Sequence, residues 1–72
     1  METIPITTEF IKLQDLLKLA ALVSTGGEAK RAIEAGEASV NGETCVQRGK
    51  KLRAGDAVLF RGHELTVAYA DR

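Results

Sequence analysis

The Asn41-Gly42 dipeptide constrains the fold of this chain more than any other short segment of the sequence. It separates residues 38–40 from residues 43–46, and both segments contain strand-forming side chains. Asn and Gly each tolerate a positive φ, which the two turn positions of a type I′ hairpin require. We therefore predict an antiparallel hairpin over residues 38–46.

A helix is predicted upstream of this hairpin, over residues 13–21. Its apolar residues recur at the spacing of one helical face, and they are Leu13, Leu16, Leu17, Ala20 and Ala21. The Ser-Thr-Gly-Gly segment at residues 24–27 then interrupts the helical pattern. This first helix should therefore end before residue 24.

A second helix is predicted between Thr25 and Gly36. Glu28 follows Thr25 by three residues, which is the pattern of a capping box. Gly36 is placed to end the helix in the left-handed conformation. The apolar stripe of this helix consists of Ala29, Ala32 and Ile33.

Further strands are predicted toward both ends of the chain. Residues 57–60 and 65–69 are expected to form a second hairpin across an exposed turn at residues 61–64. Residues 3–7 alternate weakly, and Pro5 cannot donate a ladder hydrogen bond, so at best a short edge strand forms there. Residues 48–55 are polar and are predicted to be irregular.

The chain length allows one hydrophobic core. With 72 residues we expect a single domain over residues 1–72. The single cysteine cannot form an internal disulfide, and we find no leader pattern or long apolar run in the sequence. The expected location is therefore the cytoplasm.

The charge is balanced overall but unevenly distributed. Ten Lys and Arg residues match ten Asp and Glu residues, yet four cations fall within six positions, at Arg48, Lys50, Lys51 and Arg53. No acidic residue lies between Glu43 and Asp56. Clustered cations on a loop suit phosphate contacts, because they release counterions together when they neutralise a nucleic-acid backbone. A merely solvated surface loop remains the alternative explanation of this charge.

Other cations and two glycines extend the candidate surface. Lys12 precedes the first helical turn, where the helix dipole favours a carboxylate, so we interpret it as a functional cation. Lys30 and Arg31 lie on the second helix and are expected to pair with Glu34 and Glu28, respectively. The glycines at positions 26 and 27 either expose helix amides to a phosphate or simply form a tight interhelical turn.

Four motifs in order form one pattern, and they are Lys12-Leu13-Gln14-x-x-Leu17, Thr25-Gly26-Gly27-Glu28-Ala29-Lys30-x-x-Ile33-x-x-Gly36, Val40-Asn41-Gly42 and Gly55-Asp56-x-Val58. This pattern resembles the RNA-binding domain named after small-subunit ribosomal protein S4, also called the alpha-L motif. The resemblance covers about residues 12–60. The Leu-Leu-Lys-Leu and Gly-Gly-Glu-Ala-Lys segments, with the extra strands at both ends, are similar to the stand-alone YbcJ/YaaA-like bacterial proteins.

The resemblance implies an α+β fold, in which two packed N-terminal helices lie against a small, mostly antiparallel sheet. It also implies RNA binding by the helical pair and the basic loop. Phe10, Phe60 and Tyr69 are too few and scattered to stack unpaired bases, so structured RNA is expected, with ribosomal or transfer RNA among the candidates. We expect a monomer that needs no cofactor, membrane or small-molecule substrate. Lys12 stands where the family usually has Arg, Gln14 where it has Asp, and Thr25-Gly26 where it has Ser-Arg. The predicted RNA-binding residues are Lys12, Thr25, Gly26, Gly27, Lys30, Arg31, Arg48, Lys50, Lys51 and Arg53.

An enzyme is not expected, because the sequence offers no nucleophile with a base and no metal-ligand cluster. His63 is the single imidazole and falls in a predicted exposed turn. Cys45 lacks a second cysteine and is interpreted as a small buried hydrophobic residue. The alternative function is a protein-interaction module, whose basic loop serves solubility.

Overall fold

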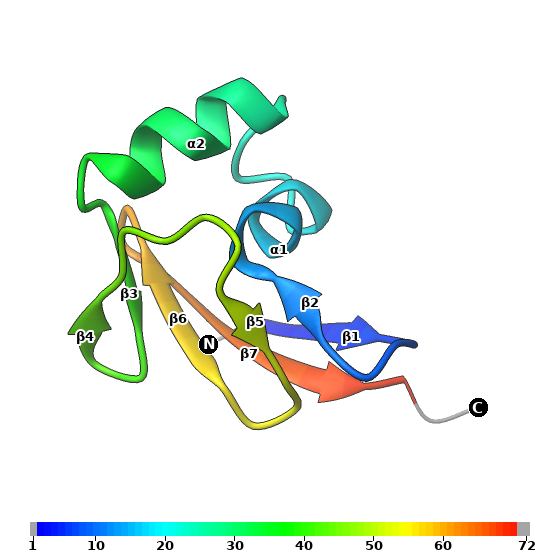
Figure 1. Ribbon diagram of the computed structural model, residues 1–72. Helices are drawn as coiled ribbons and strands as arrows, with labels where there is room; N and C mark the ends of the chain where they lie inside the picture. Colours follow the sequence, from blue (N-terminus) through cyan, green and yellow to red (C-terminus); the bar gives the residue numbers. More distant parts are fainter. Residues whose placement is uncertain (1, 71–72) are drawn as a thin grey trace.

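A five-stranded sheet forms one layer of the computed structural model, which describes residues 2–70 (Figure 1). In spatial order its strands are β1 (Glu2–Ile6), β7 (His63–Tyr69), β6 (Ala57–Phe60), β3 (Ala38–Val40) and β4 (Glu43–Thr44). The edge strand β1 runs parallel to β7, and all other neighbours in this sheet are antiparallel. The sheet is therefore mostly antiparallel, as expected.

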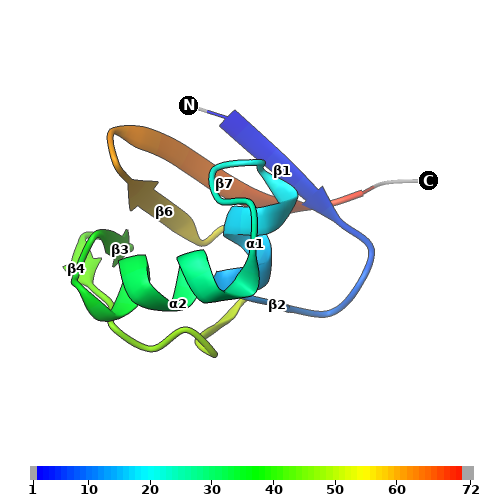
Figure 2. The same cartoon turned by 90° about the horizontal axis from the view of Figure 1, so that it is seen from above.

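Two helices form the second layer, α1 (Leu13–Leu19) and α2 (Gly26–Glu34). Seen from above, both cover the same face of the sheet (Figure 2). A separate two-stranded ribbon of β2 (Ile11–Lys12) and β5 (Lys51–Leu52) lies beside the start of α1 (Figure 1). The predicted stripe of α2 and the three leucines of the stripe of α1 are buried in one core cluster with inward-facing residues of the sheet, among them Val58, Phe60, Leu65 and Val67. Of the other two residues predicted for the first stripe, Ala20 is half-buried and Ala21 is exposed.

The first strand corrects the predicted order of elements. Because β1 and β2 precede both helices, the expectation of N-terminal helices is wrong. The alternation at residues 3–7, which suggested at best a short edge strand, belongs to a strand that buries Ile4 and Ile6. Pro5 is tolerated because β1 lies at the sheet edge and pairs with β7 alone.

The two hairpin turns use the same backbone conformation. Asn41 and Gly42 have φ of 51° and 89°, which agrees with the predicted β3–β4 hairpin. Between β6 and β7 the turn is shorter than predicted, because Arg61 adopts φ of 49° before Gly62 at 84°. His63 is consequently the exposed first residue of β7 and not part of the turn.

The two helices end in the same way, although only one end was predictable. Gly36 has φ of 83°, and the amides of Gly36 and Glu37 donate to the carbonyls of Ile33 and Ala32. This is a Schellman motif with glycine at its left-handed position. The first helix is two residues shorter than predicted, because Ala21 takes that position with φ of 62°.

Candidate nucleic-acid interface

The basic loop is held against the start of α1 by its own backbone. The amide of Leu13 donates to the carbonyl of Lys50 at 2.9 Å, and that of Gln14 donates to the carbonyl of Arg48 at 3.0 Å. These carbonyls satisfy helix amides that otherwise need a side-chain cap, which explains why Lys12 can occupy the N-cap position without capping. The loop cations are thereby fixed relative to the helix.

The predicted irregular segment 48–55 contains a short strand, which corrects the sequence prediction. Leu52 lies between Lys51 and Arg53 and is fully buried, so it anchors β5 in the core. Both flanking cations are exposed. The alternation of a buried residue with exposed neighbours follows the two-residue period of a strand.

Lys12 and Lys51 lie directly opposite each other in the β2–β5 ribbon. Like charges at directly opposed positions of an antiparallel pair destabilise it. Neither side chain forms an ion pair with any residue of the described range 2–70. The ribbon therefore holds two cations opposite each other without an acidic partner among the described residues.

Phe10 contacts Lys51 and one further cation of the loop, Arg53. The ammonium of Lys51 lies 4.8 Å from the centroid of the Phe10 ring, and the guanidinium carbon of Arg53 lies 5.9 Å from it. Such contacts are attractive and order long side chains. No sequence pattern connects Phe10 with this loop, because the contact joins residues that are far apart along the chain. We call Lys12, Arg48, Lys50, Lys51 and Arg53 the basic cluster.

The start of α2 is formed as the capping pattern predicted, with one difference. The hydroxyl of Thr25 accepts a hydrogen bond from the Glu28 amide at 3.0 Å. The Glu28 carboxylate accepts from the amide of Ser24 at 2.9 Å, and not from that of the N-cap residue itself. Within the described range, the amides of Gly26 and Gly27 donate to no other residue.

The glycines at this helix start are not required by the backbone. Gly26 and Gly27 have no positive φ and begin α2 as its first two residues. A Cβ at Gly26 would meet nothing within 4 Å, and one at Gly27 would only reach ordinary contact with Arg31 at 3.6 Å. They are thus helical residues, and the expectation of a glycine turn between the helices is wrong.

The cations of α2 lack the partners that the sequence predicted. Lys30 and Arg31 are exposed, but no ion pair to Glu34 or Glu28 is present among residues 2–70. Glu28 instead lies 3.7 Å from Arg61, because the β6–β7 turn brings Arg61 to α2. These two cations remain available, although no described contact joins them to the basic cluster.

Arg61 was missed by the sequence analysis. Its guanidinium donates to Glu37, approaches Glu28, and lies 4.8 Å from the centroid of the Phe60 ring. The hydrogen bond with Glu37 raises the pKa of Arg61, which is charged in any case. Its left-handed turn conformation and its partners become visible only in the folded chain. Arg61 thus joins a turn to a helix and is not assigned to binding.

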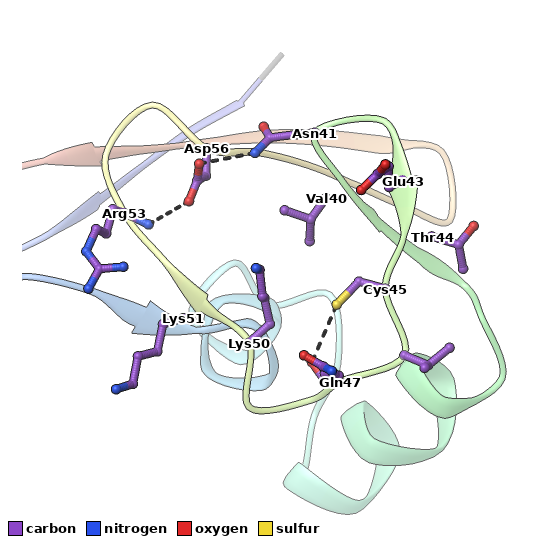
Figure 3. A pocket seen from close by; sticks show the side chains of 11 residues that line it. Val40, Asn41, Glu43, Thr44, Cys45, Gln47, Lys50, Lys51, Arg53 and Asp56 are labelled. Carbon is purple, nitrogen blue, oxygen red and sulfur yellow. Dashed lines mark hydrogen bonds between the residues drawn. The ribbon is translucent and has the colours of Figure 1, made fainter.

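A hollow adjoins the basic cluster, between the β3–β4 hairpin and the loop that leads to β5 (Figure 3). Its volume is about 600 Å³. Cys45 lines it, half buried and packed against the core, with its thiol 3.7 Å from the carbonyl of Gln47. The interpretation of Cys45 as a buried hydrophobic residue therefore holds only in part, and it follows β4 instead of lying in it.

Among residues 2–70 no group of three or more His, Cys, Asp or Glu side chains could hold a metal ion. No helix within that range has the length and apolar character needed to cross a membrane.

The two-helix layer, the small sheet and the cations beside the first helix define an α+β domain of the alpha-L type. The sequence model of the S4 domain matches residues 4–68, so the chain belongs to the S4 domain family. It is 44% identical over 59 residues to RlbA of Bacillus subtilis (strain 168), named a probable ribosome maturation protein, covering 82% of this chain and 83% of RlbA. It is 39% identical over 57 residues to YbcJ of Escherichia coli (strain K12), covering 79% and 81%.

Solved structures agree with this assignment. The solution structure of E. coli YbcJ, described as having an alpha-L motif involved in RNA binding, matches with a TM-score of 0.73 and 35% identity. The match covers 94% of this chain and 87% of YbcJ. Ribosomal protein S4e of Thermoplasma acidophilum matches in fold, with a TM-score of 0.68, 23% identity, and coverage of 90% of this chain and 34% of S4e.

Proposed function

We propose that this chain is a non-catalytic protein that binds structured RNA through the basic cluster and the adjoining helix pair. The observation that carries the proposal is the opposed pair Lys12 and Lys51, which the fold holds together without an acidic partner in the described residues. A phosphate between them would remove the repulsion and release counterions. Membership of the S4 domain family and the likeness to YbcJ support the same reading.

The start of α2 extends this proposed surface. Thr25 completes the cap, while the amides of Gly26 and Gly27 have no partner in the described range and point to a place that a second phosphate could approach. Lys30 and Arg31 lie on the same helix and add positive charge. Because none of these contacts reads a base edge, they orient the RNA without selecting its sequence.

The proposal includes a cellular setting. The name of RlbA points to ribosome maturation, so ribosomal RNA is the first candidate ligand, and the cytoplasm is the corresponding location. We further propose that residues 1–72 act as one monomeric domain, since all buried apolar residues of the described range belong to one core cluster. Neither a cofactor nor a small-molecule substrate is part of this function.

The direct test replaces Lys50, Lys51 and Arg53 together by Ala and measures RNA binding by gel shift. Three modest phosphate contacts together exceed about 1.4 kcal/mol, so the affinity should fall at least about tenfold. All three side chains are exposed, so circular dichroism should report an unchanged fold. Unchanged RNA affinity in the folded triple variant would favour the protein-interaction module.

A further inference from the structure

The hollow beside the basic cluster has the size of a ligand site. At about 600 Å³ it falls within the range of pockets that hold small organic groups, roughly 300 to 1,000 Å³. Its walls come from the β3–β4 hairpin on one side and from the segment between β4 and β5 on the other (Figure 3). A flat phosphate-binding surface does not need such a depression.

The floor of this pocket is fixed by a network of hydrogen bonds. The side-chain oxygen of Asn41 accepts from the Ala57 amide at 2.9 Å, and its amide nitrogen donates to Asp56 at 3.2 Å. The other carboxylate oxygen of Asp56 accepts from the backbone amide of Arg53 at 2.8 Å. The hairpin turn and the end of the basic loop are thereby joined, so the pocket is formed before any ligand arrives.

The chemistry of the lining fits an uncharged ring better than an anion. Two carboxylates, Glu43 and Asp56, and three cations, Lys50, Lys51 and Arg53, line the pocket. The ends of Lys51 and Arg53 extend away from it, so Lys50 is the cation directed into it (Figure 3). Glu43 and Asp56 offset part of the positive charge here, so the pocket is less suited to a phosphate than the outer cations are. A nucleobase, in contrast, presents donors and acceptors along one edge, so carboxylate, amide and ammonium groups can each be used.

The remaining lining and the surrounding charge agree with this ligand. Val40, Val46 and Cys45 offer apolar surface for the faces of a ring. Figure 3 shows the end of Lys50 directed into the pocket, whereas the Lys51 ammonium extends away from it toward the outer surface. A base could therefore enter the pocket while its backbone phosphates stay with the outer cations.

We propose that this pocket receives one unpaired base of the bound RNA, such as a bulged or loop nucleotide. The proposal rests on the proposed RNA-binding function and adds a base-reading site to it. It predicts that the protein distinguishes a hairpin RNA with a single-nucleotide bulge from the same hairpin fully paired. The site lies outside the phosphate contacts assigned above to α2.

Cys45 provides a built-in reporter, because it is the single cysteine of the chain and lines the pocket. We would measure its alkylation rate by iodoacetamide, free and with four bulged hairpins that differ in the bulged base, or with the paired hairpin. At RNA concentrations about ten times Kd, a base that fills the pocket should slow alkylation about tenfold. The paired hairpin should slow it less than about twofold at the same fractional occupancy.

A matched control moves the thiol to another face. In a Cys45→Ser, Leu59→Cys protein the thiol lies at an exposed position of β6 that does not line this pocket. Its alkylation rate should be the same with every hairpin. Equal protection of both thiols by bulged RNA would mean general shielding, and that result would overturn the base-pocket proposal.

A substitution test addresses recognition itself. The Gln47 side chain makes no hydrogen bond within the described residues and carries no charge, so Gln47→Ala leaves the charge of the surface unchanged. It should lower affinity for the bulged hairpin that protects Cys45 at least about fivefold and leave affinity for the paired hairpin unchanged.

The outcomes separate the pocket proposal from the proposed function. If every hairpin binds but no bulged base protects Cys45, the pocket proposal is wrong and RNA binding stands. If no hairpin binds at low salt, the proposed function fails and the pocket proposal fails with it.

Discussion

At the scale of single residues, the basic cluster combines a local destabilisation with a proposed gain in binding. Lys12 occupies an N-cap that suits a carboxylate and lies opposite Lys51 in the β2–β5 ribbon. Both features weaken the folded chain slightly. The unfavourable N-cap could be predicted from the sequence, because a lysine is unusual at a helix start. The opposed pair could not be predicted, because it depends on the register of β2 and β5.

Lys12→Glu should therefore stabilise the protein while weakening RNA binding. A carboxylate at this position would face Lys51 and complement the helix dipole, which together contribute about 0.5–2 kcal/mol. The loss of one phosphate contact should lower RNA affinity about fivefold to tenfold at 0.1 M salt. Thermal unfolding and gel shift on the same preparation measure the two effects.

Lys12→Gln is the matched control for this prediction, since it removes the repulsion without adding an attraction. Its stability should lie between those of the wild type and Lys12→Glu. If Lys12→Glu lowers the unfolding temperature, Lys12 and Lys51 do not repel each other significantly. The opposed pair would then no longer support the proposed function.

The residue contacts that sequence reasoning missed share one cause. Phe10 beneath Lys51 and Arg53, and Arg61 between Glu28 and Glu37, join segments that are distant along the chain. Periodicity and capping patterns describe neighbours within a few residues, so they identified Thr25 as a cap but not these partners. The predicted pairing of Arg31 with Glu28 failed because Arg61 reaches Glu28 from another element.

At the scale of helices and strands, the turns that contain Asn41-Gly42 and Gly36 could be predicted, because those residues favour positive φ. Ala21 and Arg61 adopt the same conformation without that preference, so the end of α1 and the length of the β6–β7 turn were misjudged. The surrounding fold imposes these two conformations against local preference. The order of elements was misjudged for a related reason, since β1 gains its stability by pairing with β7.

Ala21→Gly should consequently stabilise the protein, by about 1 kcal/mol, because glycine lacks the Cβ that disfavours the left-handed region. Gly36→Ala is the matched opposite change at the corresponding position of α2 and should destabilise by a similar amount. Urea unfolding of both variants measures the two values. Equal stability of Ala21→Gly and the wild type would contradict the strain assigned to Ala21.

The glycines at the start of α2 allow a test at the same scale. Gly27→Ala meets only ordinary contacts and removes the entropic penalty of glycine in a helix, so stability should stay equal or rise by up to about 1 kcal/mol. If a phosphate approaches the Gly27 amide, the more bulky Gly27→Val should lower RNA affinity more than Gly27→Ala does. Affinity that follows stability alone in both variants would assign these residues a purely structural role.

At the scale of the whole molecule, the formal net charge is zero, yet the cations of the basic cluster and of α2 are not used in ion pairs within the described residues. The ion pairs of the described residues involve Arg61 with Glu28 and Glu37. The basic cluster and the α2 cations thus have no acidic partner within that range. Composition alone could not show this, because net charge does not report how charges are paired or where they gather.

This distribution makes the salt dependence of binding the decisive test at the molecular scale. We expect most of the phosphate contacts to come from six cations, which are Lys12, Lys30, Arg48, Lys50, Lys51 and Arg53. About four to six phosphates are then neutralised, and the logarithm of the association constant for RNA should fall against the logarithm of the salt concentration with a slope of roughly −3 to −5. Lys51→Glu should reduce the magnitude of the slope by about one. Glu64→Lys, a reversal of equal size at an exposed position of β7 outside the basic cluster, should leave it unchanged. A wild-type slope near −1 would mean that at most two phosphates are engaged, and the protein-interaction module would become the better explanation.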